Sequence, residues 1–429
     1  MVDESLLLEY PEVRKLRYLF LDLNSYFASV EQQENPELRN RPMAVVPVDA
    51  DTSFIIACSY EAKAFGIKTG TRISDAKAMC PNLLCIRATP GLYTLYHRKI
   101  LDAVETVLPV EKVCSIDEMQ FRLLGKECEP VRAKEIALEM KLALRNLIGE
   151  HVRASIGIAA NPFLAKVATD MMKPDGLVIL QHEDLPHALH RLSLTDLCGI
   201  NKRMEARLQS AGIFSVEELC RSSKSELRKA WGSIVGERWW YKLRGVDLTE
   251  SESDRKSLSH SHVMAPNLRT DEGSRQVLLR LLQKASARLR SHNLLAGTMC
   301  VSVSGAKKWK KFMRFDATND LTTLTEYFAR AWSERNFSGP VKVGIDFGEL
   351  EDVTDATPSL FSAQIERADL SKAIDELNGK FGKNAVFLAG MERAKNAAPE
   401  RIAFQKTELF SEGKGDNEWP DTFRGPGRG

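Results

Sequence analysis

Hydrophobic residues in the first part of the chain recur with two periods, one typical of strands and one typical of helices. Between residues 16 and 180, short apolar runs alternate with segments whose apolar residues lie three or four positions apart. The predicted elements are, in chain order, strand 17–22, helix 25–33, strands 111–117 and 118–124, helix 131–149, strand 152–159 and helix 161–172. The first six follow the order of a ferredoxin-like sheet, with residues 35–88 inserted after the first helix.

The remainder of the chain has a different pattern. Residues 181–247 are predicted to be all-helical, and the polar, charged stretch 248–256 is predicted to be a linker. An α/β module follows, with strand 257–264, helix 271–292, strands 297–304 and 309–316, helix 321–335 and strand 340–347. Residues 413–429, rich in glycine and charge, are predicted to be disordered. The whole pattern predicts an α+β multidomain protein.

One segment of the all-helical part, residues 197–213, resembles a helix-hairpin-helix. In that unit, a glycine-bearing turn offers backbone N–H groups to a nucleic-acid phosphate without reading bases. Gly199 stands in the turn, and Asn201 stands where a second glycine is usual. Phosphate contact and plain packing of two helices are both open interpretations.

Composition limits the class of protein. The chain has 429 residues, of which 43% are hydrophobic and 28% charged, as expected for a soluble globular protein of two to four domains. No apolar run approaches the roughly 20 residues that cross a bilayer, which predicts a cytoplasmic protein without a membrane partner. The eight cysteines include no C-x-x-C pair, so neither zinc nor disulfides are predicted.

Positive charge is concentrated in the α/β module. Residues 255–342 hold 16 Lys and Arg against 6 Asp and Glu, a net charge of +10 in a chain whose total is +2. Basic residues recur along helix 271–292, and the following hairpin carries the run Lys307, Lys308, Trp309, Lys310 and Lys311. Such a run is often only a solvated face. The tryptophan among lysines, in so basic a module, favours tracking of a DNA backbone.

Three carboxylates stand where apolar runs end. Asp22 closes the first predicted strand, and Asp117 and Glu118 follow the apolar run near residue 113. Three carboxylates brought together could hold two divalent metals about 4 Å apart, an arrangement suited to in-line attack on phosphorus. Strand alternation would aim Asp117 and Glu118 at opposite faces, so they share a site only if the chain bends there. A solvated turn is the alternative.

Four segments together resemble the Y family of DNA polymerases, the low-fidelity translesion enzymes. They are residues 20–31, 59–67, 115–118 and 165–176, in the family's order and at compatible spacing. The resemblance covers nearly the whole chain. It implies a ferredoxin-like palm (1–34 and 89–180), a small fingers insertion (35–88), a helical thumb with the helix-hairpin-helix (181–247), an α/β little finger (257–350) and a C-terminal extension (351–412).

The resemblance also implies a metal site. Asp22, Asp117 and Glu118, with the backbone carbonyl of Leu23, would bind two Mg²⁺ ions per active site. Asn24 stands where many relatives have Asp, although the catalytic subunit of bacterial polymerase V has Asn in this motif.

Further residues acquire roles from the resemblance. Phe27 would be the steric gate that rejects ribonucleotides, whereas Tyr26 is expected in the core. Tyr60, Lys63 and Lys173 would bind the β- and γ-phosphates of the dNTP. Many relatives have Arg at position 63, and Lys cannot form the bidentate fork of Arg. Ser59 is explained by a role in the site or equally well as a polar turn residue. Asp170 is explained by a role in the site or equally well as a helix-surface or network carboxylate.

The implied partners are primer-template DNA, a sliding clamp and accessory damage-response proteins. Two degenerate peptides are candidates for clamp binding, one containing Leu360 and Phe361 and the other Leu409 and Phe410. Beyond residue 350 the chain resembles the polymerase V subunit more than polymerase IV, through residues 370–390 and 401–404.

Two other functions remain to be separated from polymerization. A catalytically silent family member could serve as a scaffold in a damage-response complex, but such relatives typically lack the metal carboxylates. A nucleotide cyclase could use the same sheet, but it would need neither a helix-hairpin-helix nor a basic module. No segment is left over for an exonuclease domain, so proofreading is not expected.

Overall fold

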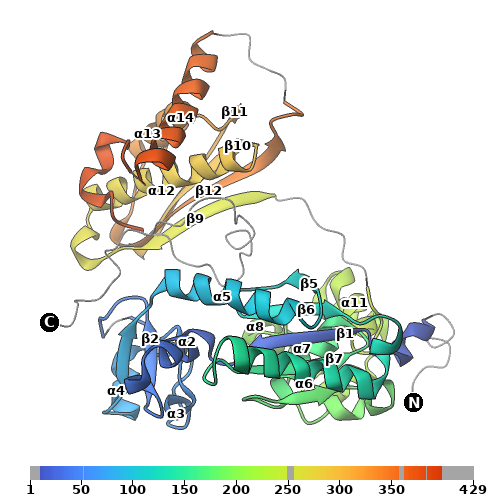
Figure 1. The fold of residues 1–429 in the computed structure, drawn as a ribbon. Coiled ribbons are helices and arrows are strands. Elements are labelled where there is room, and N and C mark those ends of the chain that lie inside the picture. Colours follow the sequence, from blue (N-terminus) through green and yellow to red (C-terminus); the bar gives the residue numbers. More distant parts are fainter. Residues whose placement is uncertain (1–9, 52, 249–255, 357–361, 383, 399–429) are drawn as a thin grey trace. The chain divides into compact units, whose positions relative to one another are not determined.

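The computed structural model describes residues 10–51, 53–248, 256–356, 362–382 and 384–398 (Figure 1). The chain forms two compact units that divide between Glu250 and Ser251. No helix among these described residues is long and apolar enough to cross a membrane.

The first unit is built on a five-stranded sheet with the order β5-β6-β1-β7-β8. The strands are β1 (Tyr18–Leu23), β5 (Val110–Val113), β6 (Glu118–Arg122), β7 (Ala154–Ala159) and β8 (Leu177–Ile179). β1 pairs antiparallel with both β6 and β7, which gives the ferredoxin-like order, and β8 adds a strand parallel to β7. The predicted sheet is confirmed, with one strand more than expected.

β1 is buried on both faces, which explains why its sequence is continuously apolar up to Asp22. Leu19, Leu21 and Leu23 pack into one core with α5 (Pro90–Glu105) and α6 (Pro130–Leu147). The alternate residues Tyr18 and Phe20 pack into a second core with α7 (Pro162–Met171). Because side chains alternate along a strand, Asp22 is directed to the α7 side.

The helix α5 was not predicted. We expected the helix after β1, which is α2 (Tyr26–Glu34), to be the first crossover helix of the sheet. Instead α5 packs beside α6, and α2 contacts the inserted sheet. The sequence did carry the signal, because Tyr93, Tyr96, Ile100 and Val104 lie at helical spacing and are buried.

The insertion forms a small sheet with the order β3-β2-β4 and a core of its own. Its strands are β2 (Met43–Val46), β3 (Ala57–Cys58) and β4 (Leu84–Arg87), and its helices are α3 (Tyr60–Lys63) and α4 (Ile73–Met79).

After β8 the first unit continues in helices and turns, as predicted. The helices are α8 (Lys202–Ser210), α9 (Val216–Arg221), α10 (Lys224–Trp231) and α11 (Ile234–Lys242). Capping boxes begin α9 and α10, with Ser215 paired to Glu218 and Ser223 paired to Glu226. These helices share the second core with α7 and β1.

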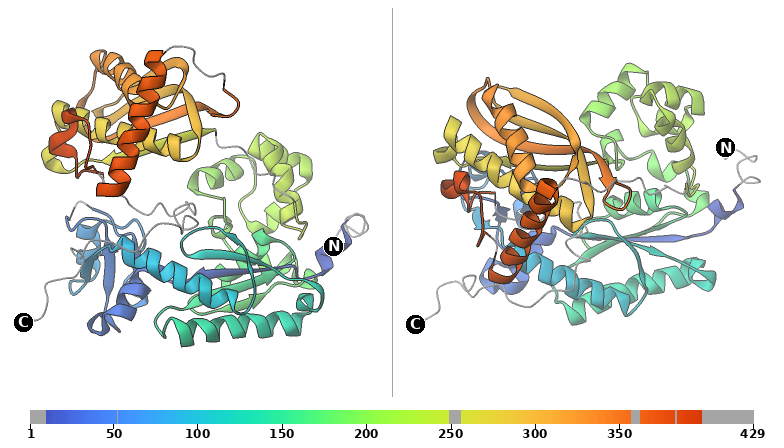
Figure 2. Two further views of the ribbon diagram at one scale, coloured as in Figure 1. Left: turned by 45° about the horizontal axis from the view of Figure 1, so that its top comes forward. Right: turned by 90° about the horizontal axis from the view of Figure 1, so that it is seen from above.

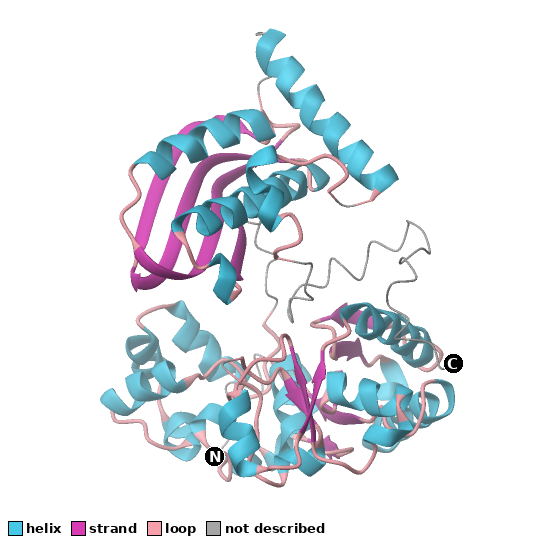
Figure 3. Cartoon of the chain, turned by 90° about the vertical axis from the view of Figure 1, so that its left-hand side faces the viewer, coloured by secondary structure: helices cyan, strands magenta, loops and turns pink. Residues whose placement is uncertain are grey.

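The second unit is an antiparallel sheet with the order β11-β10-β12-β9, and its helices lie over one face (Figures 2 and 3). The strands are β9 (Ser257–Val263), β10 (Leu294–Lys307), β11 (Trp309–Thr318) and β12 (Ser338–Asp352). The helices are α12 (Asp271–Ser291), α13 (Leu321–Ser333) and α14 (Ser362–Phe381). β10 and β12 are longer than predicted, and their pairing shifts register near Gly305.

Gly157 on β7 allows α7 to lie directly on the sheet. A Cβ at this position would lie 2.1 Å from the backbone oxygen of Ala165 and 2.7 Å from the backbone nitrogen of Thr169. Because these are backbone atoms, no rotamer change relieves the overlap. We expect Gly157→Ala to lower the free energy of unfolding by about 1–3 kcal/mol, measured by urea denaturation.

Gly379 in α14 is the control for this substitution, because a Cβ there meets nothing within 4 Å. Gly379→Ala should stabilise its helix by about 0.5–1 kcal/mol. Equal stability of Gly157→Ala and the unmodified chain would show that α7 does not need the close approach.

Glu31 on α2 is a buried carboxyl group that accepts a hydrogen bond of 2.6 Å from the Tyr93 hydroxyl. Burial raises the pKa of Glu31, against the opposing effect of that hydrogen bond. The folded state therefore keeps this proton to a higher pH than the unfolded state, so the group's contribution to stability falls as pH rises above the unfolded value of 4.5. Glu31→Gln removes this titration. The stability of the variant relative to the unmodified chain should increase with pH from about 4.5 upward, and a constant difference would contradict the account.

Candidate active site

Asp22 and Glu118 face each other across two paired strands. In the antiparallel pairing of β1 with β6, Asp22 lies directly opposite Glu118. Directly opposed residues on neighbouring strands project on the same face of a sheet. Asp22 is only 6% exposed, whereas Glu118 is half-buried. The sheet thus brings together two of the three predicted carboxylates.

The third carboxylate, Asp117, lies in the tight turn between β5 and β6. The N–H groups of Cys114 and Ser115 both donate to the carbonyl of Glu118, and the N–H of Leu23 donates to the carbonyl of Asp117. The buried His97 on α5 donates to the carbonyl of Ile116 at 2.7 Å. The chain therefore does bend between Asp117 and Glu118, as a shared site requires.

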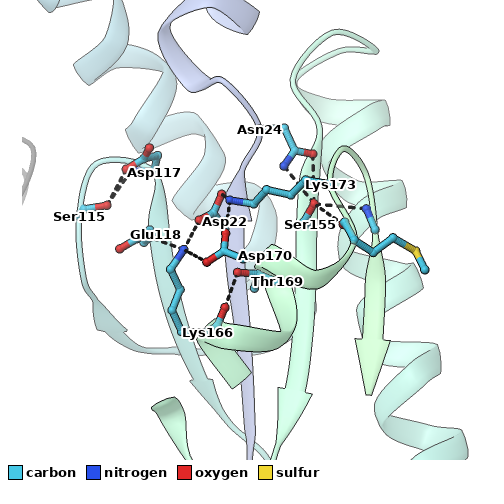
Figure 4. A network of polar contacts seen from close by, with 12 residues as sticks. Asp22, Asn24, Ser115, Asp117, Glu118, Ser155, Lys166, Thr169, Asp170 and Lys173 are labelled. Carbon is cyan, nitrogen blue, oxygen red and sulfur yellow. Dashed lines mark hydrogen bonds and ion pairs between the residues drawn. The ribbon is translucent and has the colours of Figure 1, made fainter. Parts of the chain in front are cut away.

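The carboxylate of Asp117 accepts a hydrogen bond of 2.6 Å from the Ser115 hydroxyl (Figure 4). Burial raises the pKa of Asp117 to about 6, and the negative charges of Asp22 and Glu118 add to this effect against the hydrogen bond from Ser115. Asp117 therefore interacts electrostatically with the carboxylates of Asp22 and Glu118.

Lys166 on α7 is a site residue to which the sequence motif assigned no role. Its ammonium forms ion pairs with Asp22 and Glu118, the second at 2.9 Å, and it lies 3.6 Å from Asp170 (Figure 4). Burial acts to lower the pKa of Lys166, but the surrounding carboxylate charges outweigh burial and raise it. The i, i+4 spacing of Lys166 and Asp170 on α7 was the available signal.

Lys173 neutralises the other side of Asp22. Its ammonium lies 2.7 Å from Asp22 Oδ1 and 2.6 Å from Asp170 Oδ1. Asp170 is therefore a network carboxylate, which was one of its two predicted roles. Ser59, likewise, caps α3 by accepting from the N–H of Ala62.

Asn24 positions the loop that carries Lys173. Its side chain is buried, donates to Ser155 Oγ at 3.0 Å and accepts from the N–H of Asp175 at 2.7 Å. Ser155 also bonds the carbonyl of Met172 and the N–H of Gly176, so the loop is tied at both ends to β1 and β7. Asn satisfies this network because its amide both donates and accepts.

Tyr60 and Lys63 on α3 reach the same region from the insertion. The Lys63 ammonium lies 4.2 Å from the centre of the Tyr60 ring. Burial lowers the pKa of Lys63, and the charge of Lys173 adds to this effect. Burial raises the pKa of Tyr60, while the nearby charge of Lys173 acts to lower it. The three predicted phosphate-binding residues are thus electrostatic neighbours.

Phe27 on α2 lies in the core of the first unit and is 5% exposed. Its ring stacks on Tyr93 with the ring centres 4.4 Å apart. Tyr26 is buried, as predicted, and its hydroxyl donates to the carbonyl of Tyr93.

Comparison with known proteins now connects this geometry to a family. Profiles described as the impB/mucB/samB family and its C-terminal domain match residues 21–170 and 255–360. A DNA polymerase IV of Moorella thermoacetica is 30% identical over 386 residues, which cover 86% of this chain and 95% of that protein. The chain belongs to the Y family of translesion DNA polymerases. It is a DNA-directed DNA polymerase, as predicted.

Other Y-family relatives agree. DNA polymerase IV of Oceanobacillus iheyensis is 28% identical and covers 93% of this chain and 98% of its own length. DNA polymerase IV 1 of Bacillus subtilis is 27% identical, with coverage of 93% and 99%. The solved structure of a Y-family DNA polymerase chimera matches with a TM-score of 0.65 and 20% identity, over 78% of this chain and 99% of the chimera. That likeness confirms the α+β multidomain fold.

Y-family enzymes use divalent metal, and the donor set of this site suits such an ion. Carboxylates are the ligands that hard divalent cations prefer, and Asp22 and Glu118 already converge on one cation, the Lys166 ammonium. Within the described ranges no three His, Cys, Asp or Glu side chains are close enough to hold a metal together. Asp117, turned toward Ser115, is the carboxylate that does not join the other two.

Within residues 197–213, the predicted helix-hairpin-helix, the structure has one helix, α8, and the 3-10 turn Leu194–Asp196 stands before this segment. Gly199 has φ +102° and lies against Trp239. The side chain of Asn201 caps α8 by accepting from the N–H groups of Arg203 and Met204, both at 3.0 Å. These two N–H groups are therefore satisfied within the protein.

The lysine-rich hairpin of the second unit differs from the expectation at its tryptophan. Trp309 is 9% exposed and packs against Trp332 and Phe337, so its indole is not available for stacking on a base. Strand alternation explains this, because it turns Trp309 toward the helices. Lys308 and Lys310 are exposed, whereas Lys307 bonds Asn336 and Lys311 pairs with Glu334.

The basic residues of α12 also differ from the expectation of a free DNA-tracking face. Arg290 forms two hydrogen bonds with Asp375 of α14, at 2.5 and 2.9 Å, and Lys284 donates to the carbonyl of Ala398. Arg280 is buried. Residues beyond β12 fold back over this helix and engage its cations.

The Asn24 network yields a test. Asn24→Ala leaves the Asp175 N–H and the Ser155 hydroxyl without this buried partner, so we expect a loss of about 1–3 kcal/mol in the free energy of unfolding. Hydrogen exchange should also lose protection at the Asp175 amide. Asn82→Ala, at an exposed position, is the control and should change neither quantity. Unchanged protection at Asp175 would contradict the assigned role.

Proposed function

We propose that Asp22, Asp117 and Glu118, with the carbonyl of Leu23, hold two Mg²⁺ ions for nucleotidyl transfer to a primer 3′ end. When bound, the ions would activate the primer hydroxyl and neutralise charge on the triphosphate. The single observation that carries this proposal is the convergence of Asp22 and Glu118 on one cation at the end of two paired strands, where their charges also act on Asp117.

The nucleotide would bind between the strand ends that carry Asp22 and Glu118 and the insertion, residues 35–88. The ammonium groups of Lys63 and Lys173 and the hydroxyl of Tyr60, which influence one another electrostatically near Asp22, suit the β- and γ-phosphates. To reach a phosphate, Lys173 would exchange Asp22 and Asp170 for phosphate oxygens. Lys63 binds as a point charge, without the bidentate fork that an arginine would provide.

Phe27 is proposed to exclude ribonucleotides by overlap with the 2′-hydroxyl. Its stacking on Tyr93 supports this role, because a ring fixed on one face cannot move aside for an extra oxygen. The small insertion, proposed as fingers, would enclose the nascent base pair loosely, which admits damaged templates and lowers selectivity. Synthesis without proofreading is part of the same proposal.

DNA contact is proposed for the exposed lysines Lys308 and Lys310 of the second unit and for the turn at Gly199 and Asn201. The net charge of +10 over residues 255–342 supports electrostatic binding of a phosphate backbone. A sliding clamp, accessory damage-response proteins and action in the cytoplasm belong to the proposal as well. Both candidate clamp peptides, at Leu360 and Phe361 and at Leu409 and Phe410, lie outside the described residues.

Primer extension tests the carboxylates. The purified chain should extend a primer on undamaged and abasic templates with Mg²⁺ and dNTPs. Asp22→Asn, Asp117→Asn and Glu118→Gln should each lower the rate at least about a hundredfold, because each removes a charge that balances the metals. These nearly isosteric changes preserve side-chain volume.

Asp102→Asn, at an exposed position of α5, is the matched control and should extend normally. Extension that survives all three site changes would show that the catalytic carboxylates lie elsewhere. No extension by any protein, even with a clamp added, would favour the silent scaffold.

A further inference from the structure

The ammonium of Lys166 occupies the space between the carboxylates that the proposed metals need. It contacts Asp22 and lies 2.9 Å from Glu118 Oε1, with Asp170 3.6 Å away on the next turn of α7 (Figure 4). The side chains of Lys166 and Asp22 are 13% and 9% exposed. The contact of this cation with several anions is therefore largely buried and is only weakly screened by water and salt.

The site would be electrostatically unfavourable without that cation. Asp22, Glu118 and Asp170 are held on three elements, and Asp117 adds a further acidic group. Like charges gathered around one cation and partly removed from water repel each other when that cation is absent. An internal cation allows the folded chain to keep the carboxylates in place before any metal or nucleotide arrives.

The same contact opposes metal binding. Two cations cannot share the same carboxylate oxygens without strong repulsion, so an ion between Asp22 and Glu118 requires the ammonium to leave. Asp170 gives the ammonium a nearby acceptor. Asp170 also loses its contact with Lys173 when Lys173 turns to the phosphates. The move of Lys173 to the phosphates therefore favours the move of Lys166 to Asp170.

We propose that Lys166 is the internal counter-ion of the polymerase site, a positioning residue that a divalent metal displaces toward Asp170 and that lowers metal affinity in the free enzyme. This inference rests on the proposed function of the carboxylates. Displacement of Lys166 makes metal binding depend on the nucleotide, because the negative charge of the triphosphate compensates for the charge of the added metal ion.

The test measures binding of Mn²⁺ alone to the full chain, without DNA or nucleotide, by electron paramagnetic resonance or titration calorimetry. Lys166→Met should bind Mn²⁺ at least about tenfold more tightly, because the competing charge is gone. Lys166→Arg keeps the charge and should remain near the unmodified chain. Lys166→Gln provides a second neutral variant if Lys166→Met does not fold.

Lys141→Met is the matched control. Lys141 pairs with Asp175 at 2.8 Å and is 16% exposed, but it does not contact the metal carboxylates. Its loss should leave Mn²⁺ affinity unchanged. Thermal unfolding adds a second measurement, in which Lys166→Met should melt below the unmodified chain in EDTA and gain more from added Ca²⁺.

The outcomes separate the inference from the proposed function. If Asp22→Asn abolishes Mn²⁺ binding while the neutral Lys166 variants bind as the unmodified chain does, or more weakly, the metal site stands and the counter-ion role is overturned. If Mn²⁺ binds none of the proteins, or binds independently of Asp22, both proposals fail. The counter-ion role is supported if Mn²⁺ binds more tightly to the neutral Lys166 variants but not to Lys166→Arg or Lys141→Met.

Discussion

The pairing of β1 with β6 is the constraint on which the rest of the site depends. It sets Asp22 opposite Glu118 and ties the turn that carries Asp117 to β1 through the hydrogen bond from the N–H of Leu23 to the carbonyl of Asp117. A shift of one residue would send Asp22 into the α5 and α6 core and bring an apolar neighbour to the site. The leucines of β1 prevent that shift, because they fill a fully buried face.

Charge balance is the second requirement of the fold. Buried carboxylates are tolerated only when they are paired or neutralised. Helix α7 supplies the cation Lys166, and the loop after it supplies Lys173. The close approach of α7 to the sheet at Gly157 is therefore connected to the chemistry. The loop after α7 is fixed by Asn24 and Ser155, which places the Lys173 ammonium against the carboxylates of Asp22 and Asp170.

Much of the fold could be predicted from local patterns. The apolar run ending at Asp22 and the order of strands and helices indicated a ferredoxin-like sheet, which the structure confirms. The helix α5 was missed although its apolar spacing was present. Trp309 and the α12 arginines were placed on the surface because neither strand alternation at residue 309 nor the cover by α14 was taken into account. The spacing of Lys166 and Asp170 was a local signal, but the contacts of Lys166 with Asp22 and Glu118 join three elements, and no local pattern contains them.

The most direct test of the central claim is a crystal structure of the chain with primer-template DNA, a non-hydrolysable dNTP and Mn²⁺, located by its anomalous scattering. The account predicts Mn²⁺ bound to Asp22, Asp117 and Glu118, with the Lys166 ammonium moved away from Asp22 toward Asp170. Metal bound elsewhere, or a Lys166 that still bridges Asp22 and Glu118 beside the metal, would contradict it.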